Sequence, residues 1–387
     1  MGKYKINEKK LLKIIKDLIS INSINPYLDE KGNGEWEIAN YISEFLKEIG
    51  LEVNCQKIDE KRTNIIGILK GNGKGKTLML NGHTDTVGVE GMSIQPFFPK
   101  FEKGKIYGRG SADMKGGLSA MLIAADSIAN SNLNLKGDVI FAFVVDEEYK
   151  SKGTENLVEE YSADAAIVCE PTDLKIGITH KGFVWLKVEV FGKAAHGSCP
   201  SEGIDAIVKA GKFLIELEDY ETRIIKRRHK LLGSPSVHAS KIHGGREIST
   251  YPDYCYIEIE RRTLPGEEII VEEEINYLIE RVSRRDKNFK AKSEVLFLRE
   301  ALRGEENDLI VNSLEKAYKR VLKRKPEFIG LSFWTDGAIL EKSGIPTVVF
   351  GPSGKGLHSE VEYVDFKSIV YTTKILIETI IDFCDKY

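Results

Sequence analysis

Short apolar runs alternate with amphipathic stretches along this sequence, and the alternation is interrupted once, after residue 179. Runs such as 64–69, 138–145 and 165–168 have the length and branched aliphatic content of buried strands, whereas residues 118–125 carry apolar side chains at helical spacing. Alternating strands and helices predict a mostly parallel sheet that is covered on both faces by helices. The dominant pattern therefore indicates an α/β domain of three layers.

Residues 180–292 follow a different pattern, in which the elements come in the order β-α-β-β-α-β. The expected strands lie near 184–191, 236–242, 254–262 and 291–297, and the expected helices near 203–217 and 267–283. This order is typical of a self-contained, ferredoxin-like α+β layer, so we interpret it as an inserted domain. The α/β pattern then resumes and ends in a helix that Asp365 caps. The sequence therefore predicts a discontinuous first domain, made of residues 1–179 and 293–387.

Composition argues against several classes of function. The 387 residues carry 56 basic and 59 acidic side chains, a net charge of −3, which argues against non-specific binding to nucleic acid. Apolar runs stay below the roughly 18 residues of a membrane span, and no signal-peptide pattern follows the basic N-terminus. The five cysteines form no C-x-x-C pair and are expected to be reduced thiols. We therefore expect a cytoplasmic protein that binds neither nucleic acid nor membranes.

Histidine and carboxylate side chains recur where predicted strands end and in glycine-rich loops. Sites in sheets of this kind lie beyond the carboxyl ends of the strands, so residues at these positions are expected to meet. Two imidazoles and three carboxylates form a ligand set that suits hard and borderline dications. The five candidate metal ligands are His83, Asp113, Glu148, Glu170 and His358.

Charge counting predicts two metal ions at this site. The three carboxylates bring a charge of −3 into one cleft, with Asp85 and Glu147 close by. Like charges this close would otherwise force protonation or drive the groups apart. Two dications and one bridging hydroxide would bring the inner shell to neutrality. Imidazole and carboxylate ligands favour Zn²⁺, with Co²⁺ or Mn²⁺ as substitutes.

Two further residues have expected roles beside the ligands. Side chains two positions apart in a strand point the same way, so the Asp85 carboxylate is expected to accept a hydrogen bond from the ring nitrogen of His83 that binds no metal. Glu147 and Glu148 are adjacent and point apart, so Glu148 can bind metal while Glu147 faces the open side. A water that bridges two Zn²⁺ ions is largely hydroxide near neutral pH. We expect Glu147 to take its proton and to return it to the leaving amine.

Seven motifs that span nearly the whole chain resemble those of the ArgE/DapE, aminoacylase and carboxypeptidase G family of dinuclear zinc hydrolases. They are GHTDTV at 82–87, GRGSADMKGG at 108–117, DEE at 146–148, CEPT at 169–172, FGKAAHGSCP at 191–200, RRTLPGE at 261–267 and LHSEVEY at 357–363. The resemblance implies a zinc-peptidase-like first domain. It also implies that Asp113 bridges two metals, that His83 and Glu170 hold one, and that Glu148 and His358 hold the other. Glu147 would be the general base, and the peptide bond after Asp113 would be cis.

The same resemblance assigns the inserted domain to a lid that forms a homodimer. His196 would reach across the dimer to the substrate carbonyl and stabilise the oxyanion. Arg262 would bind the α-carboxylate of the substrate, a task that suits a forked guanidinium. Ser249 stands where relatives often carry asparagine, so carboxylate recognition around Ser249 is expected to differ from theirs.

These residues predict a hydrolase that removes the acyl group from a small N-acyl amino acid, in the manner of acetylornithine deacetylase or succinyl-diaminopimelate desuccinylase. Two alternatives stay open. One is a metallo-dipeptidase or carboxypeptidase on the same scaffold, and the other is a catalytically silent, metal-binding member. The presence of Glu147, which binds no metal, argues against a silent member. A phosphate-binding loop at residues 108–117 is disfavoured, because neither G-x-G-x-x-G after a strand nor G-K-[ST] is present.

Overall fold

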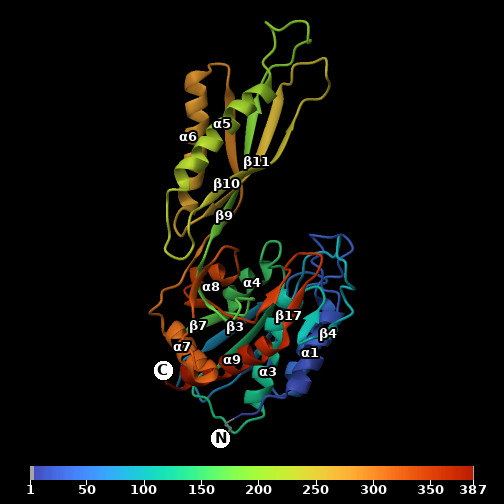
Figure 1. Cartoon of the computed structure of the whole chain (residues 1–387), viewed down its shortest axis with the longest axis vertical. Helices are drawn as coiled ribbons and strands as arrows, with labels where there is room; N and C mark the ends of the chain where they lie inside the picture. Colours follow the sequence, from blue (N-terminus) through green and yellow to red (C-terminus); the bar gives the residue numbers. More distant parts are fainter. Residues whose placement is uncertain (1–3, 387) are drawn as a thin grey trace. The chain divides into compact units, whose positions relative to one another are not determined.

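The computed structural model describes residues 4–386, which divide into two compact units (Figure 1). The first unit contains the chain up to Ile178, Gly304–Ile329 and the chain from Thr335 onwards, and the second contains Thr179–Arg303 and Gly330–Trp334. The second boundary falls later than the expected residue 292. The reason is that the last strand of the inserted unit runs on to Arg299 and stays paired that far, apart from an irregularity between Val295 and Phe297. Residues 330–334 join the second unit because Leu331 accepts a backbone hydrogen bond from Lys181.

A mixed sheet forms the centre of the first unit, with the strand order β1-β2-β6-β3-β7-β15-β8. The strands are β1 (Glu52–Lys57), β2 (Thr63–Leu69), β3 (Leu78–His83), β6 (Val139–Val144), β7 (Ala165–Val168), β15 (Thr347–Val349) and β8 (Ile176–His180). The central strands β6, β3, β7 and β15 run parallel, whereas the pairs β1/β2, β2/β6 and β15/β8 are antiparallel. The expectation of a mostly parallel sheet therefore holds only at its centre. A short loop joins β1 to β2, and a connection of this length can only link antiparallel strands.

Helices cover both faces of this sheet. They are α1 (Glu8–Ser20), α2 (Trp36–Glu48), α3 (Gly116–Ala129), α4 (Lys152–Glu160), α7 (Leu309–Leu322), α8 (Gly337–Lys342) and α9 (Phe366–Lys386). Successive residues of β3 face opposite sides of the sheet. Asn81 donates a hydrogen bond to Thr154 of α4 on one side. On the other side, Gly82 packs against Leu118 and Met121 of α3. Helices α3 and α9 pack side by side (Figure 1). The unit thus has the three layers that the sequence predicts.

Two helix starts can be compared with the sequence. The last helix begins after Asp365, whose carboxylate accepts the N–H of Ser368 at 2.8 Å, as expected for a cap. Helix α4 begins at Lys152, so Thr154 is not its first residue. Thr154 instead lies inside the helix and donates its hydroxyl to Asp336 at 2.6 Å.

A second, small sheet in the first unit was not predicted. Its strands, in the order β16-β17-β5-β4, are β16 (Gly354–Lys355), β17 (Tyr363–Asp365), β5 (Lys105–Tyr107) and β4 (Lys100–Glu102). Pairing of Tyr363 with Tyr107 places the loop before β17 beside the loop after β5. Those two loops carry His358 and Asp113, so this sheet joins candidate ligands from the two ends of the chain.

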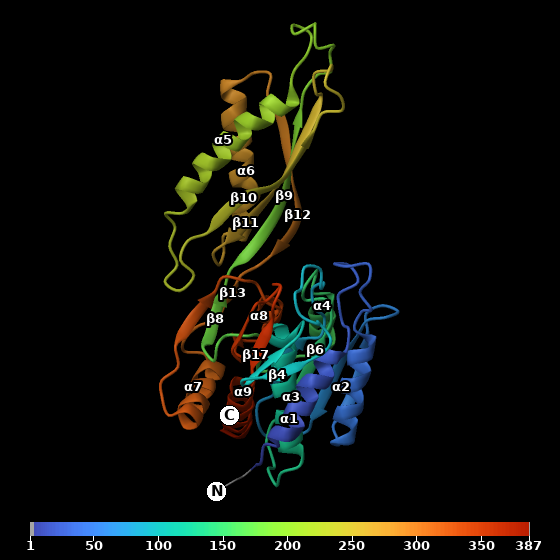
Figure 2. The same ribbon diagram turned by 45° about the vertical axis from the view of Figure 1, so that its right-hand side comes forward.

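The second unit has the expected order of strands and helices. Its elements are β9 (Gly182–Phe191), α5 (Ala206–Ile224), β10 (Ser236–Gly244), β11 (Tyr254–Thr263), α6 (Val271–Arg285) and β12 (Lys290–Arg299). The four strands are antiparallel in the order β10-β11-β9-β12. Figure 2 shows α5 and α6 on one side of these strands, where alternate residues of β9 are buried. The short strands β13 (Leu302–Arg303) and β14 (Phe328–Leu331) pair with β8.

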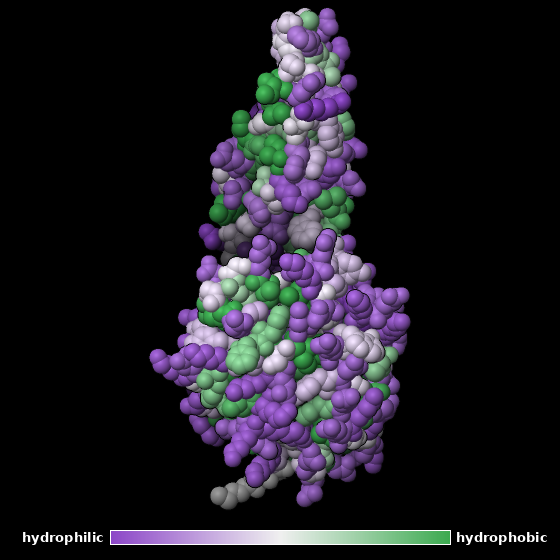
Figure 3. Space-filling model, turned by 90° about the vertical axis from the view of Figure 1, so that its right-hand side faces the viewer, coloured by the Kyte–Doolittle hydropathy of each residue, from purple (hydrophilic) through white to green (hydrophobic). Residues whose placement is uncertain are grey.

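Polar side chains cover most of the first-unit face that Figure 3 shows, and apolar side chains form separate patches there. Within residues 4–386, no helix is long and apolar enough to cross a membrane. Three long basic side chains are fully buried and not at the surface. They belong to Arg62, Lys115 and Arg261. Buried charges need partners, and the partners of Arg62 lead to the site described next.

Candidate metal centre

Three of the predicted ligands meet at the end of β3. His83 is the last residue of the strand, and its side chain is buried. Its Nε2 atom lies 3.1 Å from Oδ1 of Asp113 and 3.5 Å from Oε1 of Glu170. Glu170 follows β7, the parallel neighbour of β3. The carboxyl ends of two adjacent parallel strands therefore carry these ligands, as expected for an α/β sheet.

Asp113 also belongs to a second group of ligands. Its Oδ2 atom lies 3.3 Å from Nε2 of His358, and the same nitrogen lies 3.1 Å from Oε2 of Glu148. In each group one oxygen or nitrogen per residue lies within 4.8 Å of the others. Each group offers one imidazole and two carboxylates, donors that fit Zn²⁺ and similar dications. The structure thus brings all five predicted ligands together in two triads that share Asp113.

The loop that carries Asp113 is held by Glu362. Residues Ser111–Lys115 form a wide helical turn, and the peptide bond between Asp113 and Met114 is cis, as the resemblance implied. The buried Glu362 carboxylate accepts hydrogen bonds from backbone N–H groups at 2.8 to 3.1 Å and is paired with Arg109 at 2.8 Å. The N–H donors are those of Gly110, Ala112 and Asp113. Glu362 lies in the motif LHSEVEY, which did not indicate this role.

Asp85 holds the two adjacent glutamates through their backbone. The nearest partner of His83 Nδ1 is the main-chain oxygen of Asp85 at 3.0 Å, and the Asp85 carboxylate is farther away at 3.5 Å. This differs from the expected carboxylate contact, because Asp85 lies beyond the end of β3 and its carboxylate turns to other donors. Those donors are the N–H groups of Glu147 and Glu148, each at 3.2 Å. Asp85 therefore connects His83 to the backbone of Glu147, the predicted base, and of Glu148.

Glu147 lies beside the two triads. In the described part of the chain, residues 4–386, it belongs to neither of them. Burial raises its pKa well above the ordinary value, although nearby His83 opposes this rise. The pKa of Glu170 is raised in the same way by burial. For Glu148, burial and the charge of Asp113 raise the pKa to about 7. A carboxylate that retains basicity near neutral pH is suited to general base catalysis.

The histidines in turn are held in their charged form. Hydrogen bonds with Asp113 and Glu148 raise the pKa of His358 to about 10. Burial opposes a charge on His83, but the carboxylates of Glu170 and Asp113 outweigh it and raise its pKa. The same contacts hold the pKa of Asp113 below its ordinary value, against the effect of burial. Protons therefore balance the clustered negative charge, and bound dications would replace them.

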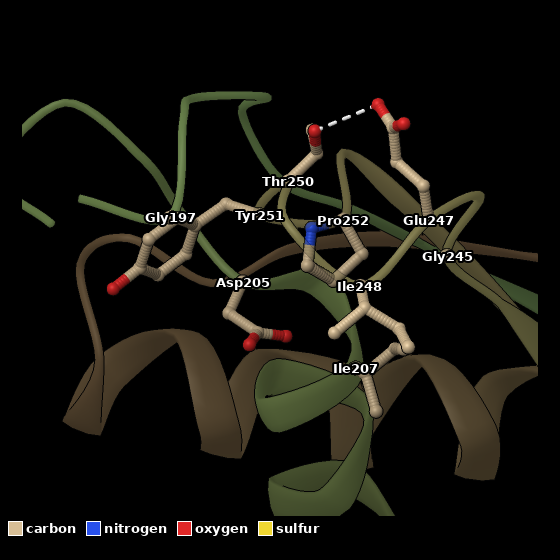
Figure 4. Close-up of a pocket in the computed structure, with 9 residues that line it drawn as sticks. All are labelled: Gly197, Asp205, Ile207, Gly245, Glu247, Ile248, Thr250, Tyr251 and Pro252. Atoms are coloured by element: carbon tan, nitrogen blue, oxygen red, sulfur yellow. Dashed lines mark hydrogen bonds between the residues drawn. The ribbon is translucent and has the colours of Figure 1, made fainter. Parts of the chain in front are cut away.

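The remaining predicted residues belong to the second unit. His196 is exposed and its Nδ1 atom lies 2.7 Å from the hydroxyl of Ser198. The exposed Ser249 accepts the N–H of Gly197 at 2.7 Å through its main-chain oxygen, so His196 and Ser249 lie on neighbouring loops. These loops border a hollow of about 440 Å³. Figure 4 shows residues that line it, among them Tyr251 and Asp205.

Arg262 lies near the far end of β11 from these loops. Its guanidinium pairs with Glu260 at 2.9 Å and lies 5.1 Å from the ring centre of Phe183. A substrate carboxylate would therefore compete with Glu260 for Arg262.

Buried residues behind the ligands were missed by the sequence reading. They are Asn25, Glu35, Arg62, Asp146, Asp336 and Glu362. Asp146 stands next to Glu147 in DEE, Asp336 stands in TDG and Glu362 stands in LHSEVEY, so these three had a local signal. The others had none, because a polar or charged residue in a sequence looks the same whether it is exposed or buried.

Two ligand triads that share one aspartate, at the carboxyl end of an α/β sheet, define the class of metal-dependent hydrolases. The sequence model of Peptidase family M20/M25/M40 matches residues 79–382, and the chain belongs to this family. The membership predicted from the motifs is thereby confirmed, and the chain is a metal-dependent amidohydrolase or peptidase of this family.

Similar proteins include both deacylases and peptidases by name. N-formyl-4-amino-5-aminomethyl-2-methylpyrimidine deformylase of Bacillus subtilis is 28% identical, over 98% of this chain and 96% of the relative. Acetylornithine deacetylase of Buchnera aphidicola is 27% identical, over 96% of this chain and 98% of the relative. Among solved structures, a tripeptidase from Staphylococcus aureus has a TM-score of 0.80 at 23% identity, over 98% of this chain and 99% of the other.

Proposed function

We propose that the protein is a dinuclear metal-dependent deacylase that hydrolyses the amide bond of a small N-acyl amino acid. The observation that carries this proposal is the pair of triads that share Asp113, with Glu147 beside them and outside both. Two relatives with nearly full coverage remove an acyl group from nitrogen, according to their names. Acetylornithine deacetylase acts on an N-acyl amino acid, which is the substrate class that we propose.

The donor set supports two dications, Zn²⁺ by preference with Co²⁺ or Mn²⁺ as substitutes. His83, Asp113 and Glu170 would hold one ion, and Asp113, Glu148 and His358 the other. When bound, such ions polarise a carbonyl and make water nucleophilic near neutral pH.

The residues of the chain would then handle protons and orientation. Glu147 takes a proton from the attacking water and passes it to the leaving nitrogen, a role typically worth about 10²–10⁴-fold in rate. Asp85 keeps Glu147 in place by accepting its backbone N–H. His196 would donate to the developing oxyanion, and Arg262 would bind the carboxylate of the substrate through two parallel hydrogen bonds. Ser249 lies on the loop next to that of His196 and would bind the substrate from there.

Distances within the second unit support a homodimer. Thr250, which bridges to His196, lies before the start of β11, and Arg262 lies near the end of this strand. The eight steps from Tyr254 to Arg262 span about 27 Å at the usual rise of a strand. One small substrate cannot touch both His196 and Arg262 of the same chain. If both act on it, one of the two must come from a second copy, which supports the proposed dimer through the lid, with His196 as the residue that the resemblance assigns to the partner chain.

A hydrolysis panel tests this function. It compares N-acetyl and N-succinyl amino acids with dipeptides, tripeptides and an N-formyl aminomethylpyrimidine, with Zn²⁺ and Co²⁺ in turn. We expect the highest kcat/KM for an N-acyl amino acid. The carboxamide of the best substrate should be about 10–100-fold poorer, because charge-assisted hydrogen bonds contribute about 1.5–3 kcal/mol. Turnover confined to peptides would instead identify a peptidase, and no turnover by the metal-loaded protein would identify a silent member.

We also propose a cytoplasmic location for the protein. The five cysteines, all within the described residues, are free in the structure, which is consistent with a reducing compartment.

A further inference from the structure

Arg62 is buried behind the metal centre and is bound on two sides. Its side chain is 1% exposed, and those of its partners Glu35 and Asp146 are 0% exposed. Nε donates to Glu35 at 2.8 Å, and Nη1 donates to Asp146 at 2.7 Å. The planar guanidinium therefore fixes two carboxylates in one geometry, which a lysine could not do.

Asp146 stands at the turn that directs the predicted base and ligand. It follows β6, and its backbone is in the left-handed region with φ = 74°. This conformation costs about 1–2 kcal/mol for a residue with a Cβ, although aspartate tolerates it better than most. The next two residues are Glu147 and Glu148. The ion pair with Arg62 therefore holds the residue at which the chain turns into Glu147 and Glu148.

Asn25 links Asp146 to Asp85. Its side-chain amide donates to Oδ1 of Asp146 at 3.1 Å and to Oδ2 of Asp85 at 2.8 Å. Asp85 in turn accepts the N–H groups of Glu147 and Glu148. Two connections therefore run from Arg62 to these glutamates, one through the backbone of Asp146 and one through Asn25 and Asp85.

Stability alone does not account for this network. One guanidinium faces three buried carboxylates, those of Glu35, Asp146 and Asp85. Apolar residues of similar volume often stabilise a core at least as well as a buried ion pair. A buried polar network that reaches from Arg62 to the backbone of two candidate site residues is better explained by what it positions.

We propose that Arg62 is a positioning residue for the metal centre, which acts through Asp146, Asn25 and Asp85 on Glu147, Glu148 and His83. The expected loss of activity rests on the proposed function, whereas the expected loss of metal affinity does not. Loss of a residue that orients a ligand typically lowers metal affinity or activity by about 10–100-fold, and we expect an effect of this order when the network that fixes Asp85 and Asp146 is broken.

The test compares two buried ion pairs in the same chain. The double variant Arg62→Met/Glu35→Gln removes the guanidinium without leaving Glu35 unpaired. The control Glu216→Gln disrupts a buried carboxylate in the second unit, which is paired with Arg281 at 3.2 Å and also with Arg285. For each variant we would measure thermal unfolding, Co²⁺ affinity, the Co²⁺ absorption spectrum, kcat and KM.

We expect the double variant to bind Co²⁺ about 10–100-fold more weakly, with an altered spectrum, and to lose kcat by a similar factor while KM changes little. Glu216→Gln should lose stability and keep the affinity, spectrum and kcat of the wild type. A folded double variant with wild-type Co²⁺ affinity and spectrum would overturn the proposal, as would an equal loss of affinity in Glu216→Gln.

If the double variant does not fold, a second variant tests the role of Arg62. Asp146→Asn preserves shape and tolerance of the left-handed conformation but weakens the link to Arg62, so Co²⁺ affinity should again fall. Wild-type affinity in this variant would overturn the proposal. If the wild type binds two ions but hydrolyses nothing in the panel, the proposed function fails while the Co²⁺ measurements still decide the role of Arg62.

Discussion

His358 Nε2 lies 3.3 Å from Oδ2 of Asp113, although the second unit separates the two residues in the chain. The pairing of β17 with β5 and the hydrogen bonds of Glu362 bring them together. The second triad contains His358, so it is complete only when segments from both ends of the first unit have folded. The first triad comes from one segment, but its Asp113 loop is held by Glu362 from the other. Formation of the metal centre is therefore coupled to formation of the whole unit.

Glu362→Gln should weaken both stability and metal binding. The amide has only one acceptor oxygen, so backbone donors of the Asp113 loop lose a partner and Arg109 loses its counter-charge. Breaking one side of a buried ion pair costs about 3–5 kcal/mol, and metal affinity should fall about 10–100-fold. Denaturant unfolding and a competitive Zn²⁺ titration measure the two effects. The exposed neighbour Glu360, changed to Gln, should show neither.

Glu147→Gln should separate catalysis from metal binding. The amide cannot accept a proton, so kcat should fall by about 10²–10⁴-fold. Metal content should stay at the wild-type level, because Glu147 belongs to neither triad of the described residues. Glu148→Gln is the matched variant and should lose metal. An unchanged kcat in Glu147→Gln would remove Glu147 from the role of base.

Metal affinity should rise with pH. The pKa of His358 is raised to about 10 in the metal-free centre, so its imidazole is protonated at pH 7. Only the neutral ring binds metal, so the ion must displace this proton, and the apparent affinity should increase at least about tenfold per pH unit between pH 6 and 8. Calorimetry in two buffers of different ionisation enthalpy counts the protons released, and we expect at least one. As a control, the variant His238→Gln changes an exposed histidine of the second unit. It should release as many protons on metal binding as the wild type.

His196→Ala should lower kcat by about 10²–10³-fold, as removal of an oxyanion donor does, while metal content stays unchanged. A mixing experiment tests whether His196 acts across a dimer. A heterodimer of His196→Ala and Glu147→Gln chains has one site with both residues intact, so random mixing should restore about a quarter of wild-type activity. Mixtures that stay as inactive as their parents would show that His196 does not act in trans.

Gly117→Ala should displace a metal ligand from a distance. A Cβ at Gly117 would lie 2.1 Å from the main-chain oxygen of Cys169, the residue before Glu170, so the backbone must shift. We expect lower stability and weaker metal binding, measured by unfolding and Zn²⁺ titration. Gly211 in α5 is the matched control, because a Cβ there would meet nothing within 4 Å. Gly211→Ala should stabilise the protein by about 0.5–1 kcal/mol and leave metal binding unchanged.

Much of the metal centre could be predicted from the sequence, because its ligands are marked locally. His83 and Glu170 end apolar runs that have to be strands, and Asp113 lies in a glycine-rich run. Strand ends in an α/β sheet converge on one edge, so chemistry and position together predicted the set. The inserted unit was equally visible, because the order of its elements is encoded in local periodicity.

What the sequence by itself determined is therefore the candidate ligands, their order, Glu147 as the proposed base and the presence of an inserted α+β unit. The tertiary structure alone decided strand direction at the sheet edges, the main-chain contact of Asp85 with His83, and the buried supports Arg62 and Glu362. The physical reason is range. Periodicity and chemistry are read within a few residues, whereas a buried ion pair forms only when distant segments exclude water from it together.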